Sequence, residues 1–142
     1  MSNPAFEIEI SMEDQKVKLK GISQSNAQRP VTFDYIPPVG TGQGYAGLEL
    51  LTMSFSGCVS TALLFLLRKS GVEISDFKAH VQGFRREKPL SLEKIVFEAE
   101  IKSPNAQDAV VRDAMGKLEA LSPVWRSLNK DITVETSYIL TE

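Results

Sequence analysis

The sequence predicts a single α+β domain, residues 1–142, in which antiparallel sheets wrap around one buried helix in the element order βββ-α-ββ-α-β. The stretch 50–67 carries no charged residue and has apolar side chains on every side of a helical wheel, which is typical of a buried helix. Segments on both sides of this stretch alternate apolar and polar residues, as half-buried strands do. A chain of 142 residues is long enough to enclose one hydrophobic core.

Strands are predicted at 6–10, 16–22 and 30–36. Apolar residues alternate with glutamates in the first segment and with lysines in the second, and the polar residues 12–15 between them indicate a hairpin turn. We therefore expect the acidic face of the first strand to meet the lysine face of the second. A loop is expected at 23–29, and Pro37 and Pro38 end the third strand.

Three glycines before the helix, Gly42, Gly44 and Gly47, match the G-x-G-x-x-G spacing of dinucleotide-binding loops. That function requires a strand directly before the loop inside a βαβ unit, whereas here a Pro-Pro break intervenes and the preceding strands look antiparallel. We therefore predict a mobile loop near the helix N-terminus, which could gate a pocket or hold an anion.

The central helix is predicted over 48–69. Its length alone would admit a membrane span, but its serine and threonine content and the 24% of charged residues in the chain favour a helix in a soluble core. Gly57 lies in its middle, where glycine costs roughly 1 kcal/mol relative to alanine. We expect a neighbouring backbone to pack closely there.

After the helix, strands at 77–86 and 92–102 form a second, longer hairpin. A helix is predicted from 103–105 to about residue 121. Ser122 and Pro123 break this helix and open a short turn, and the last predicted element is a strand at 132–140.

Composition excludes several functions. The formal net charge of -2 gives no general attraction to nucleic acid, and we expect no nucleic-acid or membrane partner. The first residues do not read as a signal peptide, and one cysteine cannot form an intramolecular disulfide, so we expect a cytoplasmic protein. One histidine and one cysteine do not make a zinc site, and no metal or cofactor is predicted. We expect a solvated surface position for His80 and a solvated hairpin end for the basic cluster Arg85, Arg86 and Lys88.

Cys58 is the residue with chemical potential, although a free buried cysteine is usually an inert small hydrophobe. Reactivity requires the thiolate, which a nearby cation, helix N-terminus or hydrogen-bond donor stabilises. Ser54 and Thr61 lie about one turn before and after Cys58 and are candidate donors. No basic residue lies within one turn.

The run Glu49-Leu50-Leu51, the run Ser56-Gly57-Cys58 and the Ser-Pro-Val run at 122–124, together with the element order, resemble the OsmC/Ohr family. These are the osmotically inducible and organic hydroperoxide resistance proteins, and the resemblance covers essentially the whole chain. It implies an intertwined homodimer with helices enclosed by sheets and active sites at the subunit interface. It also implies peroxiredoxin-like reduction of organic hydroperoxides by a redox cysteine, in defence against oxidative stress.

Carried onto this chain, the resemblance makes Cys58 the peroxidatic cysteine. The second, resolving cysteine of the family falls on Ser122, 64 residues after Cys58 and directly before Pro123, and serine cannot close the disulfide. From this spacing and the shared proline we expect the Ser122 hydroxyl to lie within a few ångströms of the Cys58 sulfur. The family's activating glutamate falls on Leu48, with Glu49 adjacent, and its activating arginine has only Arg29 as a candidate.

Two functions therefore remain open. One is a one-cysteine hydroperoxide reductase that an external thiol regenerates. The other is a non-peroxidase protein of the same fold that binds a small apolar ligand at the dimer interface. A cation at the sulfur, from Arg29 or Arg126, would favour the enzyme, and purely apolar surroundings would favour binding.

Overall fold

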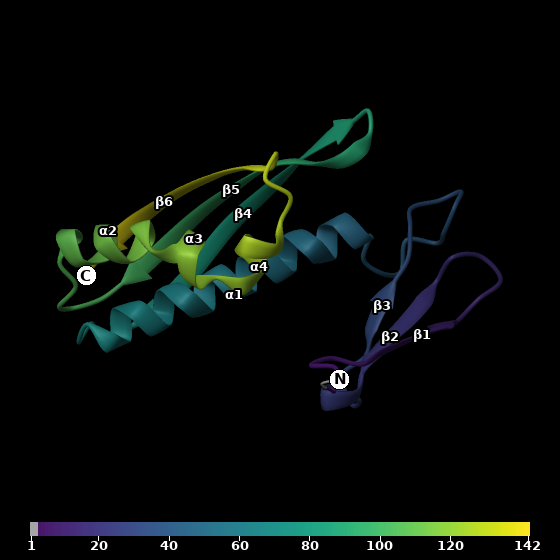
Figure 1. The fold of residues 1–142 in the computed structure, drawn as a ribbon, viewed down its shortest axis with the longest axis horizontal. Coiled ribbons are helices and arrows are strands. Elements are labelled where there is room, and N and C mark those ends of the chain that lie inside the picture. The colour runs from purple at the N-terminus through teal and green to yellow at the C-terminus, as the bar shows by residue number, and fades with distance from the viewer. Residues whose placement is uncertain (1–2) are drawn as a thin grey trace. The chain divides into compact units, whose positions relative to one another are not determined.

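The computed structural model describes residues 3–142 and confirms the α+β class and the order of strands and helices (Figure 1). The chain divides into two compact units, one ending at Leu50 and the other starting at Leu51. The first contains β1 (Ile8–Met12), β2 (Leu19–Ser23), the short 3-10 helix η1 (Gln24–Asn26), β3 (Val31–Phe33) and the start of α1 (Gly47–Lys69). The second contains the rest of α1, then β4 (Asp76–Glu87), β5 (Leu90–Lys102), α2 (Asp108–Gly116), α3 (Leu118–Leu121), α4 (Pro123–Ser127) and β6 (Thr133–Thr141).

The first unit is a three-stranded antiparallel sheet in the order β1-β2-β3. Its register differs from the expected charge pairing, because Glu9 lies opposite Ile22 and Lys20 lies opposite Ser11. The turn between the strands sets this register. Asp14 accepts hydrogen bonds from the backbone N–H groups of Lys16 and Lys18, which moves the start of the second strand to Leu19.

The buried carboxylate of Asp34 fixes the glycine-rich segment after β3. Asp34 is 5% exposed. This carboxylate accepts hydrogen bonds from the backbone N–H groups of Tyr35, Thr41 and Gln43, at 2.7, 3.2 and 3.0 Å, and from the Thr41 hydroxyl at 2.7 Å. These donors lower the pKa of Asp34 from 3.8 to about 2, with the Gln43 N–H making the largest contribution. The segment is thus a turn built on a charged centre, and not the mobile loop expected from its glycines.

We predict that Asp34→Asn destabilises this unit at neutral pH, because the amide accepts fewer hydrogen bonds and carries no charge. The folded-state pKa lies below the unfolded value, so the contribution of Asp34 to stability is present above pH 4 or so and is lost as pH falls toward 2. Urea midpoints should therefore differ between wild type and variant at neutral pH and converge in acid. Asp113→Asn, in an exposed ion pair with Lys117, is the control and should stay near wild type. An Asp34→Asn midpoint equal to that of wild type at neutral pH would contradict the prediction.

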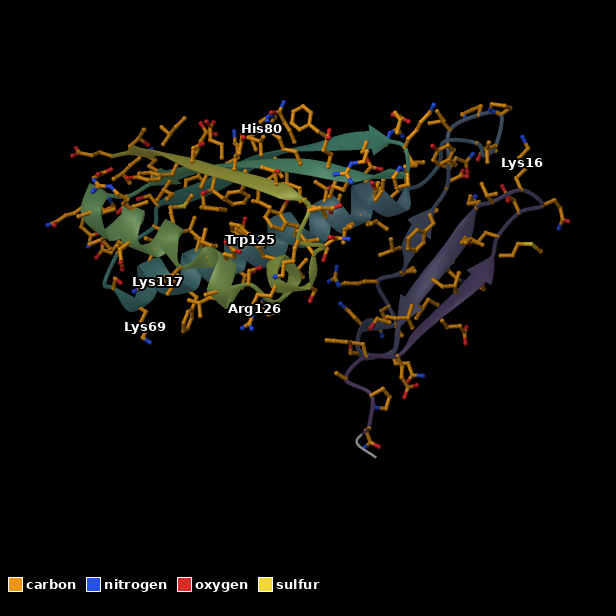
Figure 2. All side chains as sticks on the ribbon, turned by 45° about the horizontal axis from the view of Figure 1, so that its top comes forward. Lys16, Lys69, His80, Lys117, Trp125 and Arg126 are labelled. Carbon is orange, nitrogen blue, oxygen red and sulfur yellow. The ribbon has the colours of Figure 1, made fainter. Side chains whose placement is uncertain are left out.

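The second unit is a three-stranded sheet in the order β4-β5-β6, with α1 to α4 lying along one of its faces (Figures 1 and 2). β4 and β5 are the expected antiparallel hairpin, whereas β5 and β6 pair in parallel. The prediction of purely antiparallel sheets is wrong for this pair. The helices α2 to α4 return the chain to the end of the sheet where β5 started, which a parallel pair requires.

The core of the second unit lies between β5 and the helices. Its fully or nearly fully buried side chains come from β5, at Leu92 and at alternate positions from Ile95 to Ile101, from one stripe of α1 and from α2 and α3: Phe55, Val59, Leu63, Leu67, Leu92, Ile95, Phe97, Ala99, Ile101, Val111, Ala114 and Leu118. The opposite face of the sheet is mainly polar, although Phe84 and Ile139 are exposed on it, and His80 is exposed on it as predicted (Figure 2). At the outer end of the hairpin, Arg85 pairs with Glu87 and Arg86 with Asp131, consistent with the expected solvated cluster.

α1 is buried along one stripe only. Met53 and Phe65, on other sides of the helix, are 48% and 63% exposed, so the expectation of burial on every side is wrong for the single chain. A Cβ at Gly57 would meet no atom within 4 Å, so the predicted close approach of a backbone does not occur in the described part of the chain. The reason is that one sheet can cover only one side of a helix.

α1 is also long and apolar enough, by length and composition, to cross a membrane. Its buried stripe nevertheless packs on the sheet, where the Phe55 and Phe97 rings meet edge to face at 6.4 Å between centroids. This is the arrangement of a core helix in a soluble fold.

Candidate functional site

Cys58 lies at the middle of α1, on the border between the buried stripe and the exposed side. Phe55 and Val59, its neighbours on the helix, are fully buried, whereas Cys58 itself is partly accessible and its thiol is free. Helical periodicity produces this position, because residues 55, 59 and 63 share one face and residue 58 falls at its edge. The sulfur is thus held by a rigid element and can still be reached.

Ser122 is the residue that the fold brings to this sulfur. It lies at the break between α3 and α4, where Pro123 occupies the first helical position and prevents α3 from continuing. The serine is 0% exposed, and its hydroxyl lies 3.2 Å from Cys58 Sγ, although the two residues are 64 positions apart in the chain. The proximity expected from the sequence spacing is therefore present.

The hydrogen bonds of Ser122 fix the direction of its proton. Its Oγ caps α4 by accepting from the backbone N–H of Trp125 at 3.4 Å, and it donates its own proton to Cys58 Sγ. The hydroxyl thus links the N-terminus of α4 to the sulfur. A donor in this position stabilises negative charge on sulfur, or on an oxygen bound to it.

Aromatic packing holds α4 in place beside α1. The Trp125 ring meets the buried Phe55 ring at 5.5 Å between centroids, and Phe55 in turn contacts Phe97 of β5. Sequence reasoning did not find Trp125, because the Ser-Pro pair predicts only where a helix can start and not which side chain packs on the core. These rings position Ser122 against Cys58.

A cavity of about 410 Å³ opens beside the sulfur, within the range of small-molecule sites. Its lining is almost entirely apolar: Cys58, Thr61, Ala62, Phe65, Leu121 and Pro123. The Thr61 hydroxyl, a candidate donor to the sulfur, instead donates to the Gly57 carbonyl at 2.9 Å. Ser122 is thus the hydroxyl that the structure directs to Cys58.

The other candidate residues have different positions. Glu49 accepts a hydrogen bond from the Ala46 N–H at 3.3 Å, which caps the start of α1. Arg29 follows η1, and its backbone N–H bonds the Asn26 carbonyl, so the hydrogen bonds that the structure gives to Glu49 and Arg29 lie within the first unit. Arg126 is exposed on the outer side of α4 and forms no ion pair among residues 3–142 (Figure 2). It does not supply a cation to the sulfur.

Comparison with known proteins gives one family and a set of related folds. The family model described as OsmC-like protein matches residues 40–137. The structure is similar to that of an OsmC-like protein from Mycoplasma pneumoniae, with a TM-score of 0.81 at 18% identity over 99% of this chain and 100% of that chain. It is also similar to an organic hydroperoxide resistance protein OsmC from Legionella pneumophila, with a TM-score of 0.74 at 10% identity over 97% of this chain and 98% of that chain.

A third similar structure is the organic hydroperoxide resistance protein OhrB of Bacillus subtilis, with a TM-score of 0.64 at 12% identity over 95% of this chain and 98% of that chain. No curated protein matches the sequence. At these identities the solved structures establish a shared fold.

Proposed function

Because the chain belongs to the family of OsmC-like proteins, we propose that it reduces organic hydroperoxides in the cytoplasm with Cys58 as its single redox cysteine. The observation that carries this proposal is the hydrogen bond from Ser122 to the Cys58 sulfur at the mouth of an apolar cavity. The cavity accepts the organic part of a hydroperoxide, and the hydroxyl stabilises the sulfur species that the reaction forms.

In the first step, the Cys58 thiolate attacks the outer oxygen of the hydroperoxide. A sulfur–oxygen bond forms, the oxygen–oxygen bond breaks, and the sulfur is oxidised by two electrons to a sulfenic acid. The organic group leaves as an alkoxide and takes a proton from water to become the alcohol. The Ser122 hydroxyl, 3.2 Å from the sulfur, orients the thiolate and then the sulfenate by hydrogen bonding.

Regeneration requires thiols from outside the chain, because the sequence contains one cysteine and Ser122 cannot form a disulfide. A small thiol attacks the sulfenic acid, gives a mixed disulfide with Cys58 and releases water. A second thiol then attacks the mixed disulfide, releases the oxidised thiol pair and restores Cys58. The net reaction converts one hydroperoxide and two thiols into an alcohol, a disulfide and water.

The second candidate function is binding of a small apolar ligand without catalysis. The lining of the cavity favours it, since Ala62, Phe65 and Leu121 line it together with Cys58, and Arg126 is exposed on the outer side of α4. In the reductase that we propose, Cys58 is the reacting residue and Ser122 is its hydrogen-bond donor.

The proposed site is completed by a second copy of the chain. Met53 and Phe65, on the exposed apolar side of α1, are 48% and 63% exposed, and Phe65 also lines the cavity. Packing of a partner on this side would enclose the cavity and place the site at the subunit interface. We propose a homodimer of this kind.

The deciding experiment treats reduced protein with a limiting amount of cumene hydroperoxide in the presence of a sulfenic-acid probe. We predict one probe adduct at Cys58, no intramolecular disulfide, and steady consumption of peroxide when a small thiol is added. Cys58→Ser should give neither adduct nor consumption above background. An unmodified Cys58 in wild type would exclude the reductase and leave ligand binding.

A further inference from the structure

Trp125 contacts both the hydrogen-bond donor of the sulfur and the helix that carries the sulfur. Its backbone N–H donates to Ser122 Oγ at 3.4 Å, and its ring meets the Phe55 ring at 5.5 Å between centroids. Phe55 lies three residues before Cys58 on α1, which is nearly one helical turn. Trp125 therefore connects Ser122 to the same stretch of backbone that holds Cys58.

The short helix α4 depends on contacts outside itself for its position. It has five residues, Pro123–Ser127, whereas isolated helices shorter than about 12 residues are marginal in water. Figure 2 shows Trp125 on the side of α4 toward the sheet and Arg126 on the outer side. Leu128, just beyond the helix, is buried and holds its far end. The Trp125 ring anchors the first turn of α4, next to Ser122.

The ring contact is more rigid than the hydrogen bond that caps α4. Phe55 is 0% exposed and also meets the Phe97 ring edge to face at 6.4 Å, so it is held on two sides in a close-packed core. The cap from the Trp125 N–H is 3.4 Å long, beyond the about 2.7–3.2 Å of most N–H···O bonds, and a small shift breaks it. The 3.2 Å between Ser122 Oγ and Cys58 Sγ is therefore maintained by the rings rather than by the cap.

We propose that Trp125 is a positioning residue for Cys58, in which the ring packed on Phe55 holds the Ser122 hydroxyl at the sulfur. Trp125 is not among the residues that line the cavity at Cys58, so its effect passes through Ser122. The consequence for catalysis rests on the proposed reductase function, whereas the geometric role does not.

The geometric test uses the Ser122→Cys protein, in which the equilibrium between dithiol and disulfide against glutathione gives the effective concentration of the two thiols. No hydroperoxide takes part. In this background Trp125→Leu should lower the effective concentration about three- to tenfold, the range expected for an edge-to-face ring pair, and Trp125→Phe should keep most of it. Phe55→Leu should also lower it. Adding Trp125→Leu to Phe55→Leu should cost little more, because the two rings share one contact.

The matched control is Val111→Ala in the same background. Val111 is fully buried on α2, so its truncation lowers the stability of the fold without removing a ring contact, and the effective concentration should stay at the parent value. A Trp125→Leu protein with the parent value, or a loss that Val111→Ala reproduces, would overturn the inference. If Trp125→Leu does not fold, the comparison of Phe55→Leu with Val111→Ala decides in the same way.

A single-turnover measurement separates this inference from the proposed function. With Ser122 in place, Trp125→Leu should slow the oxidation of Cys58 by cumene hydroperoxide about three- to tenfold, and Trp125→Phe should restore the rate. Binding of cumyl alcohol, the product, should not change, because the cavity keeps its lining. An oxidation rate unchanged by Trp125→Leu would overturn the role in catalysis. No oxidation in wild type, together with the expected loss of effective concentration, would reject the reductase and keep Trp125 as the residue that positions Ser122.

Discussion

Replacing Ser122 by cysteine is expected to produce a protein that closes an intramolecular disulfide with Cys58 when it meets one equivalent of hydroperoxide. The Ser122 side chain already points at the sulfur, with its Oγ 3.2 Å from Sγ. A disulfide needs about 2.05 Å between sulfurs, so closure requires only a small approach of two side chains that are in contact. The introduced thiol would attack the sulfenic acid at Cys58 and release water.

Mass spectrometry under non-reducing conditions measures this outcome. Wild type should carry an oxidised Cys58 and no disulfide, whereas Ser122→Cys should lose two hydrogens and show one linked peptide pair. Ser127→Cys is the matched control, because it lies on the same short helix, is exposed and hydrogen-bonds the Pro123 carbonyl. An oxidised Cys58 without a disulfide in Ser122→Cys would show that residue 122 does not face the sulfur in solution.

Sedimentation is expected to give twice the mass of one chain, with no folded monomer at micromolar concentration. The physical reason is the exposed apolar side of α1, where Leu51, Met53 and Phe65 are exposed, because apolar side chains gathered on one exposed face mark an interaction site. Met53→Glu should dissociate the dimer or prevent folding, because it places a charge in the proposed interface.

Ile139→Glu is the control for this substitution. Ile139 is 44% exposed, close to the 48% of Met53, but it lies on β6 in the second unit's sheet. The Ile139→Glu variant should therefore still sediment with the mass of a dimer. A folded wild-type monomer, or equal effects of the two substitutions, would reject an interface on α1.

Local patterns predicted most of the elements. The alternation of apolar and polar residues located both hairpins, and the helix predicted over 48–69 around the uncharged stretch matches α1, Gly47–Lys69, to within one residue. Both patterns are local, because they record which face of a strand or helix each side chain lies on, and residues a few positions apart in the sequence are enough to reveal them. The prediction of one helix over 103–121 was less accurate, since α2 ends at Gly116 and a separate helix, α3, starts at Leu118.

Features that depend on contacts distant in the chain were not predicted. The parallel pairing of β5 with β6 follows from the direction in which the crossover returns, and alternation is the same in parallel and antiparallel strands. The role of Asp34 is another case, because its donors come from residues up to nine positions later. The proximity of Ser122 to Cys58 was expected from the family resemblance. The hydrogen bond by which Ser122 Oγ caps α4, and which directs the Ser122 proton to the sulfur, depends on the backbone geometry between α3 and α4 and was not predicted.

The parallel pairing of β6 also has a consequence for the order of folding. Cys58 lies on α1, which can fold early because the hydrogen bonds of a helix are local. Its hydrogen-bond partner Ser122, however, is 64 residues away, in the crossover between β5 and β6. That crossover leads into β6, which pairs with β5, and Tyr138 of β6 hydrogen-bonds Asp108 at the start of α2. The free energy cost of closing so long a loop is recovered only at this step. We therefore expect Ser122 to reach the thiol only after β6 has paired with β5, so that the environment that directs the reactivity of Cys58 forms late in folding.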